Sequence, residues 1–471
     1  MSNGASSTLG AGSDAAGTLD PSSQVPLSLG VSVQPERYTF GLSVPIGLGL
    51  PPVPDIQAGI PQTPLGGSRS ADPRRAASGQ SNQARRSGVP LFGERRFIAN
   101  EVMVRLPSGY SAQALDALAR RHNLGRVQSL AVGLAGTTLH RWRFFDGRSV
   151  PDVIRALESD ANVLAAQPNY VFTLAEQVQA RAELESEQYA LEKLHVLQAH
   201  RFSTGRNALV AVIDSGIDES HAEIAGLVAA RFNAVDAGGP PDLHGTGMAG
   251  AIVAHARLKG IAPSARILAV RAFGSAGAQS GTTASILRGL DWAVTHHARI
   301  INMSFAGPYD PEIARALAAA HQSGVVLVAA AGNAGPKSPP QYPAADPNVI
   351  AVTATDADDR LFPMANRGRY VAVSAPGVDI LTAAPGGAYQ MTTGTSVAAA
   401  QVSGVAALLL GRVPALRPET VKQVLMSSSA DLGPRGRDDQ FGAGLTDAYR
   451  ALQSITAMAP GPMAGGASPQ R

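Results

Sequence analysis

The hydrophobic and polar positions between residues 97 and 174 follow the periods of short strands and helices. Apolar residues alternate with polar ones in some segments and recur every three or four residues in others. Alternation predicts strands, and the longer spacing predicts helices. The expected elements are a strand at 99–106, a helix at 111–124, strands at 126–132 and 137–145, a helix at 150–159 and a strand at 163–174. This β-α-β-β-α-β order predicts a small ferredoxin-like α+β domain.

A second pattern extends from about residue 205 to residue 452, where short and nearly continuous apolar segments alternate with helix-like ones. Such apolar segments are typical of strands buried on both faces of a parallel sheet. The expected strands are 208–214, 266–272, 299–304, 324–332 and 348–354, and helix-like segments include 281–297 and 311–324. The alternation predicts an α/β domain of about 250 residues with a doubly wound, mostly parallel sheet.

The two ends of the chain lack either pattern. Residues 1–96 are rich in Gly, Ser, Pro and Ala, and the whole chain has 50 Gly and 33 Pro, more than a packed protein of this size needs. We therefore expect a disordered leader at 1–96, or alternatively an export or anchoring segment of an unfamiliar type, since no standard signal peptide is visible. Residues 453–471 are expected to form a disordered tail.

Composition excludes several kinds of function. The chain has no cysteine, which removes thiol catalysis, disulfides and cysteine-based zinc sites. Its 39 basic and 36 acidic residues leave a net charge of +3, too balanced for nucleic acid or an anionic membrane as the main partner. Because no run of 18 apolar residues occurs, we expect no transmembrane segment.

Four residues in the large domain carry candidate chemistry. Taken singly, Asp214 could cap a turn, His244 could be a structural or surface residue, and Ser396 could be a helix N-cap. Taken together, they supply a hydroxyl, an imidazole to take its proton, and a carboxylate to fix the tautomer of that imidazole. Asn333 follows another buried strand, and its amide could donate to an oxyanion together with the Ser396 backbone N–H. The combination predicts nucleophilic acyl transfer.

Five motifs around these residues resemble a known family. In chain order they read VAVIDSGID, HGTGMAG, INMSFAG, AAAGNAGP and GTSVAAAQVSG. The sequence is similar to subtilisin-like serine peptidases, the subtilases, over nearly all of residues 186–452, and the order Asp, His, Ser is a known feature of that family. The resemblance implies a serine endopeptidase that hydrolyses protein or peptide substrates through an acyl-enzyme, with catalytic residues Asp214, His244, Ser396 and Asn333.

The same resemblance implies where substrate binds. Ser304, Phe305 and Ala306 would form one edge of the cleft, with Ala306 narrowing it because Gly is frequent there. Ala331 and Gly332 would form the facing edge of the pocket for the side chain before the scissile bond. Substrate would add as an extended strand. The alternative is that both segments are ordinary core strands.

The resemblance also implies a role for the small domain. Its last predicted strand, in NVLAAQPNYVFTL, is similar to the end of subtilase propeptides. Residues 97–174 would then be a propeptide that assists folding and inhibits the enzyme, and residues 175–187 a linker with the autoprocessing site, between about Leu174 and Glu187. The catalytic domain would span 188–452. The family further implies secretion or a cell-envelope location.

Further departures from the family pattern change these expectations. Ala400 stands where many members have Pro, and Gln401 replaces a frequent His, so we expect an altered rate rather than lost activity. Between His244 and the GIAPSA segment only AIVAHARLK intervenes, so the usual calcium-binding loop is absent. We expect no metal or other cofactor, with calcium elsewhere left open. Glu223, where an Asp ligand often lies, is expected at the surface.

Two other functions compete with an active peptidase. The fold could be inactive and serve only for binding, although every catalytic residue type is present. A lipase or esterase of the α/β-hydrolase kind would need a G-x-S-x-G elbow, and the sequence contains none.

Overall fold

The structure is a computed structural model of the chain, and it describes residues 87–175, 177–179, 188–235, 238–274 and 280–458. All of them lie in the second of the two units into which the chain divides, residues 82–471. The predicted leader up to residue 86 and most of the predicted linker therefore lie outside the described residues.

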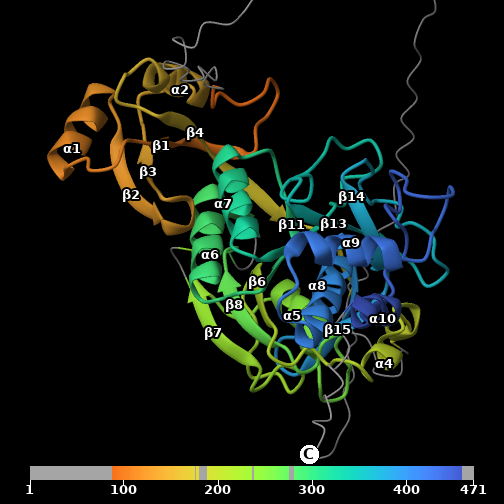
Figure 1. Cartoon of the computed structure of the whole chain (residues 1–471). Coiled ribbons are helices and arrows are strands. Elements are labelled where there is room, and N and C mark those ends of the chain that lie inside the picture. The colour runs from red at the N-terminus through yellow and green to blue at the C-terminus, as the bar shows by residue number, and fades with distance from the viewer. Residues whose placement is uncertain (1–86, 176, 180–187, 236–237, 275–279, 459–471) are drawn as a thin grey trace, which may run out of the picture. The chain divides into compact units, whose positions relative to one another are not determined.

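The small domain has the predicted order of elements. They are β1 (Phe97–Arg105), α1 (Ala112–Arg121), β2 (Gly125–Val132), the 3₁₀ turn η1 (Gly133–Ala135), β3 (Thr137–Arg143), α2 (Val150–Glu158) and β4 (Ala165–Leu174). The hydroxyls of Ser111 and Ser149 cap the two helices by accepting a backbone N–H from the first turn. The strands pair antiparallel in the order β4-β1-β3-β2 (Figure 1), so the ferredoxin-like prediction is confirmed.

Each face of this small sheet has its own cover. One face packs against α1 and α2 around buried side chains that include Trp142, Phe144 and Ile154. The other face contributes Met103 and Leu139 to a cluster with two helices of the large domain. The small domain is thus seated on the large one through an apolar centre.

The predicted leader ends earlier than expected. Residues 87–96 are described, and the Ser87 hydroxyl and the Gly88 N–H donate to the Glu158 carboxylate over 2.7 and 2.6 Å. These bonds fasten the segment to the end of α2. The boundary at residue 96 is therefore wrong by about ten residues, because composition does not reveal a partner 70 residues away.

The large domain is built on a seven-stranded sheet whose neighbours all pair parallel. Its order is β14-β13-β12-β10-β6-β8-β7. The strands are β6 (Leu209–Asp214), β7 (Val228–Asn233), β8 (Arg266–Arg271), β10 (Ile300–Met303), β12 (Val326–Ala330), β13 (Val349–Thr355) and β14 (Val371–Pro376). This confirms the predicted mostly parallel sheet.

Helices cover both faces of that sheet. The longer ones are α5 (Leu243–Val253), α6 (Thr283–Thr295), α7 (Pro311–Gln322), α8 (Thr395–Arg412), α9 (Pro418–Ser428) and α10 (Ala448–Met458). Val210 and Val212 of β6 join a core with α5, α8, α9 and α10, whereas Ala211 and Ile213 join the core with α6 and α7. The side chains of one strand thus alternate between two buried layers, which explains its unbroken apolar sequence.

Several shorter elements surround the sheet. They are α3 (Tyr189–Lys193), α4 (Val196–Ala199), β9 (Ser280–Thr282), β11 (Phe305–Ala306), and the sheet of β15 (Ile380–Ala384), β16 (Ala388–Thr393) and β5 (Gln177–Gln179). At the C-terminal end, α10 continues to Met458, and Ile455 is buried in the core. The predicted start of the tail at residue 453 is wrong by six residues because Ile455 extends the apolar face of that helix.

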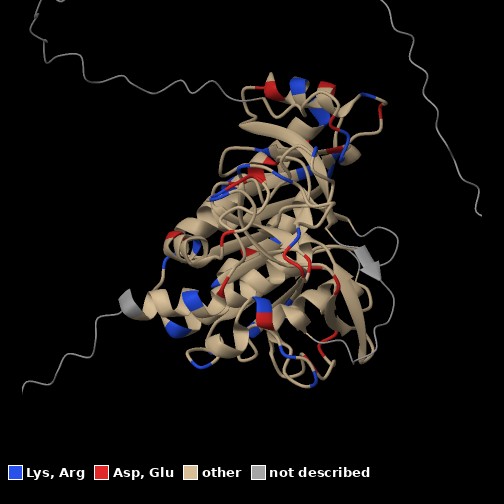
Figure 2. Cartoon of the chain, turned by 90° about the vertical axis from the view of Figure 1, so that its right-hand side faces the viewer, with Lys and Arg blue, Asp and Glu red and all other residues tan. Residues whose placement is uncertain are grey.

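Charged residues lie mainly on outer helices and loops, while the central layers are mostly uncharged (Figure 2). Within the described residues, α8 is the one helix long and apolar enough to cross a membrane by length and composition. It lies almost entirely inside the core, where a helix of a folded domain also needs an apolar surface on all sides.

Candidate active site

Asp214 and His244 meet at the carboxyl end of the central strand. Asp214 is the last residue of β6, and His244 is the second residue of α5, whose N-cap Asp242 accepts the His244 N–H over 3.1 Å. The His244 Nδ1 lies 2.6 Å from the Asp214 Oδ1, and both side chains are buried. An ionised carboxylate only accepts hydrogen bonds, so Nδ1 carries the proton and the tautomer is fixed.

The close approach of α5 to β6 depends on a glycine. A Cβ at Gly245 would lie 2.9 Å from the carbonyl oxygen of Ser215 and 3.0 Å from that of Gly216. Ser215 adds a second fastening, since its N–H donates to Asp214 over 2.7 Å and its hydroxyl accepts the Gly245 N–H over 3.0 Å. In the HG pair of this motif, His244 thus supplies the imidazole, and Gly245 is needed for the helix to pack closely.

Ser396 and Asn333 meet at the carbonyl oxygen of Ala175. The Ser396 hydroxyl, at the start of α8, donates to this oxygen, and the Asn333 Nδ2 donates to it over 2.8 Å. The amide of Asn333 is oriented by Thr395, whose N–H and hydroxyl donate to its Oδ1 over 3.1 and 2.8 Å. Thr395 was not among the predicted site residues, although its place beside Ser396 in the GTS motif was a usable signal.

Residues 171–175 form the middle strand of three as they enter this site. On one side, Leu174 and Thr173 pair with the two residues of β11, and the Ala175 N–H donates to the Ser304 carbonyl over 3.2 Å. On the other side the segment pairs antiparallel with β9. The predicted edge at Ser304, Phe305 and Ala306 therefore lies beside an extended chain.

The predicted facing edge lies directly before Asn333. Ala331 and Gly332 follow β12 and are buried, and Gly332 has a φ of +105°. A Cβ at Gly332 would lie 2.5 Å from the Asn366 side chain. A second strand, β9, flanks residues 171–173; it was not predicted because its three residues Ser-Gly-Thr have no apolar pattern.

An aromatic pocket holds the side chain of Phe172, three residues before Ala175. Phe172 is fully buried and meets Phe305 edge-to-face, with ring centroids 6.1 Å apart, and Phe305 lies 5.0 Å from Phe273. Gly307 leaves room for the Phe172 ring, because a Cβ there would lie 2.2 Å from it. Beyond the site, β5 pairs antiparallel with β16, so the chain is held on both sides of residue 176.

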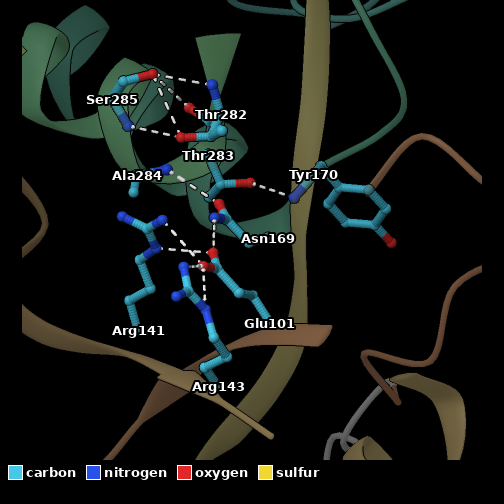
Figure 3. Close-up of polar contacts among 9 residues, drawn as sticks. All are labelled: Glu101, Arg141, Arg143, Asn169, Tyr170, Thr282, Thr283, Ala284 and Ser285. Carbon is cyan, nitrogen blue, oxygen red and sulfur yellow. Dashed lines mark hydrogen bonds and ion pairs between the residues drawn. The ribbon is translucent and has the colours of Figure 1, made fainter. Parts of the chain in front are cut away.

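Polar contacts surround the same strand where it leaves the small domain (Figure 3). The Tyr170 N–H donates to the Thr283 hydroxyl over 2.9 Å, and the Ala284 N–H at the start of α6 lies 3.4 Å from the Asn169 Oδ1. The Asn169 Nδ2 donates in turn to the buried carboxylate of Glu101 over 2.7 Å. The first turn of α6 thus contacts the Asn169 side chain and the Tyr170 backbone of the small domain.

Glu101 is the centre of this network. Arg141 and Arg143 both donate to its carboxylate, over distances from 2.5 to 3.1 Å. Burial alone would raise the pKa of Glu101, but the hydrogen bonds from Arg141, Arg143 and Asn169 outweigh it, and the pKa lies below its ordinary value. The carboxylate stays charged although no part of the residue is exposed.

A second buried carboxylate joins the two domains. Asp310 caps α7 and accepts the Gln167 Nε2 of β4 over 2.8 Å and the Thr283 hydroxyl over 2.5 Å. Burial raises the pKa of Asp310, and these hydrogen bonds oppose the rise.

The structure shows where the residues that depart from the family pattern lie. Ala400 and Gln401 are buried within α8, which continues through them as helix. The prediction that Glu223 lies at the surface is wrong: its exposure is 0%, because three backbone N–H groups surround its carboxylate. No cluster of three or more His, Cys, Asp or Glu suited to a metal occurs within the part of the chain that the structure describes.

Two family models match the chain. The model described as the subtilase family matches residues 205–444, and the model described as the fervidolysin N-terminal prodomain matches residues 86–169. Together they cover the large and the small domain.

Known proteins resemble the chain over most of the same residues. The minor extracellular protease Epr of Bacillus subtilis (strain 168) is 35% identical over 65% of this chain, which spans only 49% of that protein. Subtilisin E of the same organism is 32% identical over 73% of this chain and 87% of its own length. Among solved structures, fervidolysin from Fervidobacterium pennivorans, a keratinolytic enzyme related to subtilisin, matches with a TM-score of 0.67 and 27% identity. That match covers 79% of this chain and 63% of fervidolysin.

Proposed function

The chain belongs to the subtilase family of serine peptidases, and from that premise we propose that it is an endopeptidase that first cuts its own chain between Ala175 and Glu176. One observation carries the proposal. The carbonyl oxygen of Ala175 accepts hydrogen bonds from both the Ser396 hydroxyl and the Asn333 amide. A peptide carbonyl that contacts both a candidate nucleophile and a candidate oxyanion donor supports attack at Ala175.

The proposed reaction gives each of these groups the role that its residue type has in a serine peptidase. The Ser396 Oγ attacks the Ala175 carbonyl carbon while His244 takes the hydroxyl proton, and the carboxylate of Asp214 stabilises the imidazolium. Asn333 and the Ser396 backbone N–H donate to the oxyanion. His244 then gives the proton to the amine of Glu176 as the C–N bond breaks. Water hydrolyses the acyl-enzyme by the same steps and releases the Ala175 carboxylate.

The docked segment also explains inhibition after the cut. Residues 171–175 would stay paired with β9 and β11 as a product strand, and the apolar and polar contacts of the small domain hold it there. The new carboxylate of Ala175 would remain beside Ser396. Activity on other substrates therefore begins only when the small domain leaves or is degraded.

The segment indicates the class of substrate. Phe172 fills the pocket of Phe273, Phe305 and Gly307, and Ala175 lies at the reacting position. We expect extended peptides with a small residue before the cut and an aromatic or large apolar residue three positions earlier. A secreted location is part of the proposal, supported by the name of the extracellular relative.

Intact-mass measurement of the purified full chain tests this proposal. We expect the unchanged protein to yield a new N-terminus at Glu176, and the Ser396→Ala variant to remain unprocessed. Ser323→Ala, an exposed serine at the end of α7, is the matched control and should process normally. Labelling of Ser396 by a serine-directed phosphonate separates the enzyme from an inactive binding protein. Processing of Ser396→Ala at the normal rate would contradict the mechanism.

A further inference from the structure

The carboxylate of Glu223 accepts several hydrogen bonds from the loop that follows α5, the helix that begins near His244. Its Oε2 accepts the Ala256 N–H over 2.8 Å, and its Oε1 accepts the N–H groups of Arg257 and Leu258 over 2.7 and 2.9 Å. The hydroxyl of Tyr389 donates to the same Oε1 over 3.0 Å. Three consecutive backbone N–H groups and one hydroxyl thus converge on one buried carboxylate.

This junction joins three segments of the large domain. The N–H donors belong to the loop that follows α5, Tyr389 belongs to β16, and Glu223 lies in the connection between β6 and β7. α5 and β15 lie side by side (Figure 1). Beside the carboxylate, Ala254, Leu258, Leu381 and Tyr389 form a small apolar cluster.

Further hydrogen bonds hold the residues next to Glu223 and the loop after α5. The Glu223 N–H lies 3.1 Å from the His221 Nδ1, and the His221 Nε2 lies 2.9 Å from the carbonyl oxygen of Ala388. The side-chain amide of Gln188 makes a reciprocal pair with Lys259, accepting its N–H over 2.8 Å and donating to its carbonyl over 3.1 Å. The loop is therefore held at both its beginning and its end.

The donors at Glu223 are the wrong kind for a cation. Calcium needs six to eight oxygen ligands at about 2.3 to 2.6 Å. Here the groups that face the carboxylate are N–H and O–H donors, whose positive ends would repel a cation. Burial alone would raise the pKa of Glu223, but the N–H groups of Leu258, Ala256 and Arg257 outweigh it, and the pKa lies below its ordinary value. The carboxylate is satisfied without a counter-ion.

We propose that Glu223 and its four donors form a metal-free clamp, in which a fixed carboxylate fastens the end of the His244 helix where a calcium-binding loop would serve in a subtilase. The clamp makes the stability of this junction independent of calcium. The clamp affects the stability of the fold, so this proposal can be tested independently of the proposed peptidase reaction.

Thermal unfolding of the full chain in the Ser396→Ala background tests the clamp without self-digestion. The variant Glu223→Gln keeps the shape but loses the charge, and Glu219→Gln makes the same change at a partly exposed residue four positions earlier, paired with Arg231 at the surface. We expect Glu223→Gln to lower the Tm by about 5 °C or more and Glu219→Gln by less than about 1 °C. The Ser396→Ala parent and each of the two variants are measured in calcium chloride and in EGTA.

The comparison of the two conditions decides the proposal. A Glu223→Gln shift of the same size in calcium and in EGTA supports a metal-free clamp. A shift that disappears in EGTA would overturn it, because calcium would then act through Glu223, and so would a shift no larger than that of Glu219→Gln. Should Glu223→Gln fail to fold, Tyr389→Phe removes one donor only. It should lower the Tm by about 1 to 3 °C in both conditions, and a loss confined to calcium would be equally contrary.

Discussion

Among the described residues, the small and the large domain each bury one glutamate completely, and they satisfy its carboxylate with different hydrogen-bond donors. Glu101 of the small domain is surrounded by the side chains of Arg141, Arg143 and Asn169 (Figure 3). Glu223 of the large domain is surrounded mainly by backbone N–H groups of one loop. Both arrangements supply the hydrogen bonds that a buried charge requires.

The difference matches what the two domains are proposed to do. Backbone donors are positioned by the fold itself, so the Glu223 clamp persists as long as the large domain is folded. The partners of Glu101 are long side chains, and Arg143 is 39% exposed, so water can replace some of their contacts. The network reaches α6 through the Asn169 side chain. The large domain and the small domain that we propose is removed thus use the same residue type with different partners.

The largest expected effect concerns whether the two domains are cut apart at all. His244→Ala removes the base that activates Ser396, so self-cleavage should slow by about 10⁴ to 10⁶. The fraction of uncut chain over time, measured by mass spectrometry, checks this. His255→Ala, at an exposed histidine, should cut at the normal rate. Ordinary cleavage in His244→Ala would mean that another base serves the large domain.

Removal of one oxyanion donor should have the next largest effect. Asn333→Ala loses the bond to the Ala175 carbonyl and should slow self-cleavage by about 10² to 10³. Tyr170 and Glu101 are untouched, so the docked small domain should remain in place and only the chemical step should slow. A single-turnover time course of the purified chain measures it. An unchanged rate would place the oxyanion elsewhere.

The aromatic contact between the domains should have an intermediate effect. Phe172→Ala empties the pocket beside Phe273 and Phe305 and should slow self-cleavage by about 10- to 100-fold. Phe145→Ala removes an exposed ring from the same domain and is the matched control. Equal rates for the two variants would show that the pocket does not position the strand.

Comparison of the two regions also shows what a sequence can predict. The apolar periods predicted both folds, because most strands of the small domain and the inner strands of the large one have buried apolar residues at regular spacing. The pairing of Asp214 with His244 was predictable because each lies in a distinctive motif. The contacts of Glu223 and Phe172 were not, since they depend on loops and pairings between distant segments. A three-residue strand such as β9 has too few positions for any period to appear.

Release of the small domain should respond more weakly to the Glu101 network. Glu101→Gln weakens the hold of the two arginines and of Asn169, so the lag between self-cleavage and hydrolysis of an added peptide should shorten by roughly three- to ten-fold. The assay follows a chromogenic peptide after self-cleavage has finished. Glu158→Gln, at the end of α2, is the control for a general loss of stability. If both variants shorten the lag equally, the network has no special part in docking.

The smallest effect tests the charge of Glu223 through the pH dependence of stability. The pKa of Glu223 lies below its ordinary value of 4.5, so its stabilisation is fully present above about pH 4.5 and is lost as the pH falls through the lower folded value. The Tm difference between the Ser396→Ala protein and the same protein with Glu223→Gln should be constant from pH 7 to pH 5 and shrink below about pH 4.5. His221, Tyr389 and Arg257 face the same site, but they are present in both chains, so their own titration largely cancels in the difference. A difference that grows on acidification would mean that the clamp binds the protonated acid, contrary to a carboxylate held by three N–H groups.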